Sequence, residues 1–169
     1  RYVLLFGCTS GDGAEIFRRC FMVPEQIERE TVIAAPVERV WSVLTEAEHI
    51  GQWFAHAGAE VDLRPGGLIV MRWEEHGTYL ARIEQVEPYR LFSYRGAYPA
   101  DEEPRNGNST LVEFILSPEG DGTRLRVVES GFTSLAVPEE EKRTRIEENT
   151  QGWQGGLTEL KSYVERLAA

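Results

Sequence analysis

The sequence predicts an α+β fold in which one antiparallel sheet packs against a long helix. One strand pattern and two short helical patterns come first, six strand patterns separated by turns follow between residues 59 and 132, and a long amphipathic segment ends the chain. Strands joined by short turns pair with their sequence neighbours, so the middle of the chain predicts an antiparallel meander. The length of 169 residues is that of one domain with one core.

The first three elements follow from local patterns. Residues 27–33 mix β-branched and charged side chains and predict a strand that ends before Pro36, because proline cannot donate a hydrogen bond to a sheet. Proline suits the first turn of a helix, and apolar residues at helical spacing over 37–44 predict one. A second short helix is expected over 46–53, with Thr45 as its N-terminal cap.

The final helix is predicted from one apolar stripe after Pro138. Its members recur every three, four or seven positions; they are Ile146, Trp153, Leu157, Leu160, Val164 and Leu167. Gly152, Gly155 and Gly156 interrupt the pattern, each at a cost of up to about 1 kcal/mol relative to alanine. Two explanations stay open: close approach of the helix to the sheet or to a ligand near Trp153, or a kink or a late helix start near Thr150.

Composition and charge exclude several classes of protein. The 41% apolar and 27% charged residues are typical of a folded domain rather than a disordered or fibrous chain. A net charge of −10 repels phosphate backbones and anionic lipid heads. We therefore expect neither nucleic acid nor a membrane as a partner.

Residues 1–21 differ from the rest of the chain. They contain both cysteines, Cys8 and Cys20, and show no sustained period. We expect them to be an extension outside a single domain that spans residues 22–169, with Met22 as a natural start. No secretory signal or Cys-x-x-Cys motif occurs, so the cytoplasm is the expected compartment.

The sequence contains no pattern that predicts a cofactor or a metal. His49, His56 and His76 lack metal-ligand spacing, and neither a phosphate loop nor a serine-hydrolase elbow is present. We therefore expect neither a metal nor a cofactor.

Nine short motifs, in order along the chain, carry a resemblance to a known family. They are Ile27-x-Arg29, Ala35-Pro36-x-x-x-Val40-Trp41, Leu44-Thr45, Gln52-Trp53-Phe54, Arg64-x-Gly66-Gly67, Ile83-x-x-Val86-x-Pro88, Gly122-Thr123-x-Leu125, Glu129-Ser130-Gly131-Phe132 and Gly152-Trp153-x-x-x-Leu157-x-x-Leu160-Lys161-x-Tyr163. Together they resemble the bacterial proteins named for the activator of the heat-shock-protein-90 ATPase. That family belongs to the START-like, birch-pollen-allergen-like SRPBCC superfamily. The resemblance implies a helix-grip fold, with a curved sheet of about seven strands wrapped round the C-terminal helix and enclosing a hydrophobic cavity.

Glu129 is the most informative candidate site residue. By strand alternation it shares a face with Leu125 and Val127. If that face is the inner one, burial raises the pKa of its carboxyl and suits it to hydrogen-bond a ligand or to move a proton. The alternative is a structural ion pair with Arg82 or Arg95, or a rim position in water.

Apolar side chains from the segments around the expected cavity are the other candidates for ligand contact. They are Trp53, Phe54, Met71, Trp73, Tyr94, Phe132 and Trp153. Large aromatics chiefly fill core volume, so we expect most of these residues to be core residues and fewer of them to line a cavity.

Three functions are compatible with these residues. The leading hypothesis is a binding protein for a small apolar molecule such as a lipid, a polyketide or an aromatic compound. The alternatives are an enzyme like a polyketide cyclase or dehydratase, with Glu129 or a tyrosine transferring protons, and a stress-linked module that binds a chaperone. Exposed sheet edges would also allow a homodimer.

Overall fold

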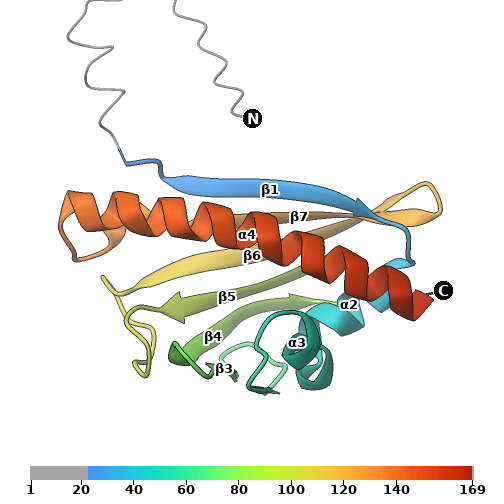
Figure 1. Cartoon of the computed structure of the whole chain (residues 1–169), viewed down its shortest axis with the longest axis horizontal. Helices are drawn as coiled ribbons and strands as arrows, with labels where there is room; N and C mark the ends of the chain where they lie inside the picture. Colours follow the sequence, from blue (N-terminus) through green and yellow to red (C-terminus); the bar gives the residue numbers. More distant parts are fainter. Residues whose placement is uncertain (1–22, 169) are drawn as a thin grey trace, which may run out of the picture.

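The computed structural model describes residues 23–168, so the predicted extension over residues 1–21 lies outside the described part of the chain. The strands are β1 (Gln26–Ile33), β2 (Ala59–Val61), β3 (Leu68–Trp73), β4 (Gly77–Glu87), β5 (Leu91–Ala97), β6 (Ser109–Glu119) and β7 (Gly122–Ser130). The helices are α2 (Val37–Thr45), α3 (Ala47–Trp53), the 3-10 turn η1 (Phe132–Ser134) and α4 (Glu139–Ala168). The predicted α+β helix-grip layout is confirmed: a curved antiparallel sheet, two short helices after β1 and a long final helix (Figure 1).

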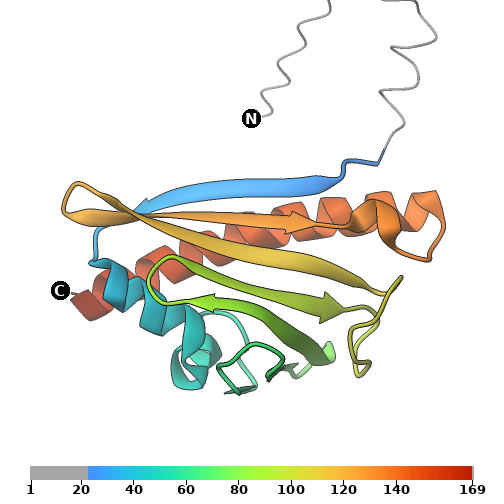
Figure 2. The ribbon, with the colours of Figure 1, turned by 180° about the vertical axis from the view of Figure 1, so that it is seen from behind.

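The seven strands form one sheet in the order β1-β7-β6-β5-β4-β3-β2. Strands β2 to β7 form a meander in which each strand pairs with the next. Strand β1 lies at the edge beside β7 and pairs antiparallel with it, with Gln26 opposite Ser130 at one end and Ile33 opposite Thr123 at the other. α4 crosses one face of this sheet, while the view from behind shows the strands in front of the helix (Figure 2). The chain therefore places its last helix against strands from both halves of the sequence.

The two faces of the sheet differ in chemistry. On the face away from α4, exposed arginines and glutamates pair across neighbouring strands, as in Arg126 with Glu28 at 2.8 Å and Arg95 with Glu84 at 3.1 Å. Such exposed pairs contribute at most about 1 kcal/mol each. On the face toward α4, Leu125, Val127 and Glu129 of β7 are all buried, as the strand alternation predicts.

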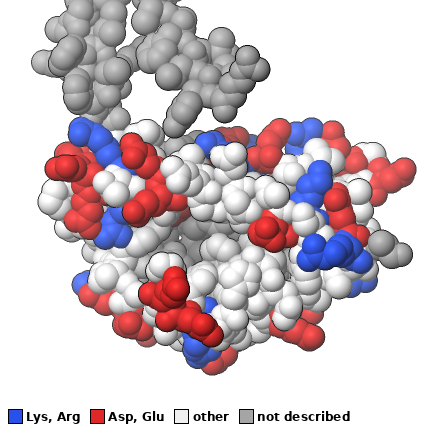
Figure 3. All heavy atoms as spheres, viewed as in Figure 1, with Lys and Arg blue, Asp and Glu red and all other residues white. Residues whose placement is uncertain are grey.

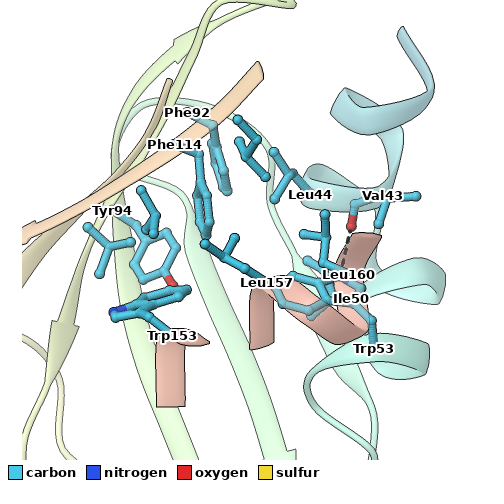
Figure 4. Packing of buried hydrophobic residues seen from close by; sticks show 14 of the residues in the cluster. Val43, Leu44, Ile50, Trp53, Phe92, Tyr94, Phe114, Trp153, Leu157 and Leu160 are labelled. Atoms are coloured by element: carbon cyan, nitrogen blue, oxygen red, sulfur yellow. Dashed lines mark hydrogen bonds between the residues drawn. The ribbon is translucent and has the colours of Figure 1, made fainter. Parts of the chain in front are cut away.

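The core lies between α4 and the concave face of the sheet. Leu157 and Leu160 of α4 point toward Phe92 and Phe114 of the sheet, which stack with ring centroids 6.4 Å apart (Figure 4). On the other side of α4, the indole N–H of Trp53 donates to the carbonyl of Val43 at 3.1 Å, joining α3 to α2. The two short helices thereby close one end of the groove between helix and sheet.

Two expectations about helix ends were wrong. Thr45 does not cap α3: its hydroxyl is buried in the last turn of α2 and donates to the Trp41 carbonyl at 2.8 Å, while Glu46 occupies the cap position without a side-chain bond. Leu167 is 38% exposed, because it lies in the final turn of α4, beyond the last buried position at Val164.

α4 is continuous from Glu139, so the late helix start near Thr150 is also wrong. The turn that sets its path begins at Gly131, whose φ of 95° lies in the left-handed region that favours glycine. The Lys142 ammonium then donates to the Thr133 carbonyl at 2.9 Å and ties the first turn of α4 to η1. This anchoring fixes which side chains of α4 face the end of β7.

In residues 23–168 no helix combines the length and the apolarity needed to cross a bilayer.

The packing of α4 predicts that replacing two leucines of this helix by alanine will destabilise the protein to very different extents. Leu160 is fully buried and Leu167 is 38% exposed. Leu160→Ala is expected to lower the free energy of unfolding by about 2–5 kcal/mol through lost burial and a residual cavity. Leu167→Ala, the matched control, is expected to change it by less than about 1 kcal/mol. Urea denaturation measures both, and similar losses for the two variants would contradict this packing.

Candidate functional site

A cavity of about 220 Å³ lies between α4 and the sheet. It is lined by side chains of β3 to β7, α4 and the segment after α3, namely Phe54, Trp73, Tyr79, Tyr94, Tyr98, Val112, Glu129, Glu148, Asn149, Gly152 and Trp153. Other hollows of the described residues are larger, at about 380, 590 and 390 Å³, but none of these three is walled by several aromatic rings. We therefore take the smaller cavity as the candidate site.

The polar centre of this cavity is the carboxylate of Glu129, which is 2% exposed. The Thr110 hydroxyl donates to Oε1 at 2.7 Å, and the Trp153 indole N–H donates to Oε2 at 2.7 Å. The Asn149 amide Nδ2 lies 2.9 Å from Oε1 and 3.1 Å from Oε2. The Tyr98 hydroxyl also hydrogen-bonds Glu129 and accepts from Asn149 Nδ2. Strand β6, helix α4 and the loop after β5 thus converge on one side chain.

The alternative prediction of an ion pair at Glu129 was wrong. Arg82 pairs with Glu103 at 2.7 Å and Arg95 with Glu84 at 3.1 Å, because both arginines point to the opposite face of the sheet. Among the described residues, no cationic side chain forms a salt bridge with Glu129. The guanidinium of Arg145 stacks on the ring of Tyr98, 4.6 Å from the ring centroid.

Burial and hydrogen bonding act in opposite directions on Glu129. Burial raises the pKa of its carboxyl, and the hydrogen bonds from Thr110, Trp153, Asn149 and Tyr98 lower it, with a net rise above 4.5. The Asn149 Nδ2 and the Trp153 Nε1 can only donate, and between them they reach both carboxylate oxygens. These hydrogen bonds therefore oppose the rise in pKa that burial causes, without cancelling it.

Aromatic rings form the walls of the cavity. Phe54 lies parallel to Trp153, with centroids 6.2 Å apart, and meets Trp73 edge to face at 5.2 Å. The Trp73 indole N–H donates to the Phe54 carbonyl at 2.9 Å and so fixes β3 to the end of α3. Tyr79 completes this wall with its ring 6.4 Å from that of Trp73.

The tyrosines of the cavity are held neutral. Burial, and next the negative charge of Glu129, raise the pKa of Tyr94 and of Tyr98 well above 10.0. The pKa of Tyr79 is also raised well above 10.0, mainly by burial. These phenols therefore offer O–H groups and ring faces to a ligand.

Gly96 makes the position of Tyr79 possible. A Cβ atom at Gly96 of β5 would lie 1.4 Å from the Tyr79 hydroxyl oxygen. The absence of a side chain on β5 therefore allows the phenol of the neighbouring strand β4 to lie across it and reach the cavity.

The structure brings five of the eight residues predicted for the site together: Phe54, Trp73, Tyr94, Glu129 and Trp153 all line the cavity. The other three, Trp53, Met71 and Phe132, are buried in the core outside this lining. Trp53 stacks on Phe54 with centroids 5.0 Å apart and so supports the wall from behind.

Several lining residues were missed by sequence reasoning. Tyr79 alternates with the buried Ala81 and Ile83 on β4, a period-two signal that could have found it. Asn149 lies one helical turn before Trp153, and a polar residue on the apolar stripe of a helix is also a usable signal. Tyr98 lies in a loop, where no periodicity indicates its direction.

The histidines do not take part in the cavity. His49 Nδ1 lies 2.8 Å from the Tyr163 hydroxyl and connects α3 to α4. Within residues 23–168 no group of three or more histidine, cysteine or acidic side chains could hold a metal ion.

The raised pKa of Glu129 predicts a distinct pH dependence of stability. Because the folded state holds this proton more tightly than the unfolded chain, the contribution of Glu129 is most favourable below 4.5 and is lost as the pH rises through the folded pKa. We subtract the free energy of unfolding of Glu129→Gln from that of the wild type. This difference is expected to fall as the pH rises from 4.5 through the pKa of Glu129 in the folded protein. Urea denaturation at a series of pH values measures the difference. A difference that increases with pH would show that the hydrogen bonds outweigh burial.

Comparisons with known proteins agree with this architecture. Residues 34–165 match the profile of the family described as Activator of Hsp90 ATPase homolog 1-like protein. Protein MLL2253 from Mesorhizobium loti is 25% identical, with a TM-score of 0.68 over 83% of this chain and 97% of that one. CalU16 from Micromonospora echinospora is 27% identical, with a TM-score of 0.64 over 82% of this chain and 75% of that one.

The Aha1 dimer from Colwellia psychrerythraea shares the fold, at 17% identity and a TM-score of 0.66 over 83% of this chain and 96% of that one. No curated protein matches the sequence. The family profile covers most of the chain, including every strand after β1 and the part of α4 that lines the cavity. This protein therefore belongs to the Activator of Hsp90 ATPase homolog 1-like family, within the START-like SRPBCC superfamily.

Proposed function

We propose that this protein binds a small aromatic molecule in the cavity between α4 and the sheet. The observation that carries this proposal is the aromatic wall formed by Phe54, Trp73, Tyr79, Tyr94 and Trp153 around one space. Ligand sites are typically concave, mostly apolar and supplied with a few polar groups, and Glu129 with Asn149 supplies these here.

The volume of the cavity limits the size of the apolar ligand that it can hold. A buried apolar cavity of roughly 150 Å³ accommodates benzene, so about 220 Å³ accommodates a compound of one or two rings. A large polyketide or a long-chain lipid requires more space. Flat rings also stack well on Trp153 and Phe54, whose planes differ by only 7°.

The enzyme alternative has less support from this geometry. A general base needs a free lone pair directed at the substrate. The Glu129 carboxylate has about four lone-pair sites, and the side chains of Thr110, Tyr98, Asn149 and Trp153 already hydrogen-bond it. A binding role requires no such free lone pair.

The other expected partners remain predictions. Dimerisation is stated for the Colwellia protein, and the sheet of this chain offers β1 and β2 as its two edges. A chaperone partner is suggested by the family description alone, and the cytoplasmic location likewise rests on the sequence patterns.

Binding of a small aromatic probe at this site can be measured from the NMR signals of the tryptophan side chains. Trp73 and Trp153 line the cavity, whereas Trp41 packs against Tyr89 and Phe92 elsewhere. Titration with indole is expected to shift the Nε1–H resonances of Trp73 and Trp153 in a ¹H–¹⁵N NMR spectrum and to leave that of Trp41 in place. Equal shifts at all of these resonances, or none, would contradict a specific site.

Two glycines of α4 offer a matched pair for blocking the cavity. A Cβ at either Gly152 or Gly155 would meet no atom within 4 Å, but only Gly152 lines the cavity. Both Gly152→Leu and Gly155→Leu are expected to stabilise the helix by up to about 1 kcal/mol. Only Gly152→Leu is expected to weaken indole binding, by tenfold or more (~1.4 kcal/mol), because its side chain fills the cavity entrance. Equal affinities for both variants would place the binding site elsewhere.

A further inference from the structure

We propose that the small aromatic ligand of this cavity is an organic cation, and that its positive alkylammonium group lies against the aromatic wall. This inference rests on the proposed function and specifies its ligand class. It follows from three features of the same space: a buried carboxylate without a cationic partner, aromatic faces on several sides, and a second carboxylate at the entrance.

The first feature is the uncompensated charge of Glu129. The carboxylate is 2% exposed, and its hydrogen-bond partners Thr110, Asn149 and Trp153 are all neutral. Buried charges in proteins are usually paired or bound to a metal. The nearby guanidinium of Arg145 is engaged elsewhere, with Glu141 at 2.6 Å and with the ring of Tyr98. A bound cation would supply the partner that Glu129 lacks and would favour the ionised form of its carboxyl.

The second feature is the arrangement of the rings. Phe54 and Trp73 meet at 86°, and Trp73 and Tyr79 at 75°, so the rings form adjoining walls rather than one flat stack. Ring faces directed into one space attract an ammonium ion, most strongly when tryptophan contributes.

The third feature is Glu148, an exposed residue of α4 that also lines the cavity. It lies one helical turn before Gly152, at the open side. No salt bridge to Glu148 is formed within the described part of the chain. The face of the molecule around α4 carries both acidic and basic groups at its margins and a largely uncharged surface between them (Figure 3). With a net charge of −10, the protein disfavours the approach of an anion and favours that of a cation.

A neutral hydrogen-bonding ligand is a poorer match to the same geometry. Donors from β6, α4 and the β5–β6 loop occupy the acceptor sites of Glu129, so a neutral hydroxyl or amide group would have to bond to the tyrosine hydroxyls of the cavity instead. A cation needs no free lone pair, because its attraction to the carboxylate acts through space.

The test uses two molecules of the same shape. Choline carries a trimethylammonium group, and 3,3-dimethylbutan-1-ol carries an uncharged tert-butyl group in its place. Titration of the full chain at neutral pH, followed by the Nε1–H resonances of Trp73 and Trp153, is expected to show at least about tenfold tighter binding of choline. Equal affinities for both molecules would overturn the cation inference and leave the proposed function standing.

Binding of indole without binding of choline would also overturn the inference. If none of the three molecules shifts these resonances, the proposed function itself fails. The two ideas can thus fail separately.

Two variants that each remove one carboxylate test whether the preference for choline arises in the cavity or from the net charge of the protein. Glu148→Gln removes a carboxylate from the cavity entrance, and Glu147→Gln removes one from the neighbouring exposed position, which does not line the cavity. Both variants change the net charge equally. Glu148→Gln is expected to weaken choline binding about threefold without changing that of the neutral alcohol, and Glu147→Gln to change neither. Equal losses from both variants would attribute the preference to overall charge and not to the cavity.

Discussion

The buried carboxylate of Glu129 is the interaction on which the arrangement of helix and sheet depends. It lies near the end of β7 and accepts hydrogen bonds from Thr110 of β6 and from Asn149 and Trp153 of α4. A buried charge is tolerated only when it is well hydrogen-bonded. Rotation of α4 about its axis would remove the donors Asn149 and Trp153 and leave the carboxylate with Thr110 and Tyr98 alone, so Glu129 favours one orientation of the helix. That orientation in turn directs Trp153 and Gly152 toward the cavity.

The cavity persists because apolar packing and polar bonding occupy different parts of α4. Toward its C-terminal half, Leu157, Leu160 and Val164 are buried and fill the groove. One turn earlier, Gly152 supplies no side chain, and the helix leaves a space that the aromatics of β3, β4 and β5 surround. The free energy lost through Gly152 is therefore associated with this space, as the first of the two explanations expects, whereas Gly155 does not line the cavity.

Most of the fold could be predicted from the sequence because its signals are local. The period-two strands, the proline before α2 and the apolar stripe of α4 each depend on residues a few positions apart, and the structure contains all of these elements. The candidate site was predicted only in part. Tyr79 reaches it because Gly96, on another strand, has no side chain. Tyr98 reaches it from a loop, and Trp53 and Phe132, which look equally suitable, pack into the core. Such outcomes depend on contacts between distant segments, which a single sequence does not display.

The same residue links stability and ligand choice in this molecule. An ionised Glu129 loses solvation on folding, and that loss is only partly offset by its neutral donors. A positive ligand beside the aromatic wall would offset more of it, because the attraction between opposite charges is stronger where water is excluded. A ligand that binds only the folded state stabilises that state. Under the proposed preference for a cation, the carboxylate of Glu129 would both destabilise the unliganded fold and favour a positive ligand, and replacing it would change the two together.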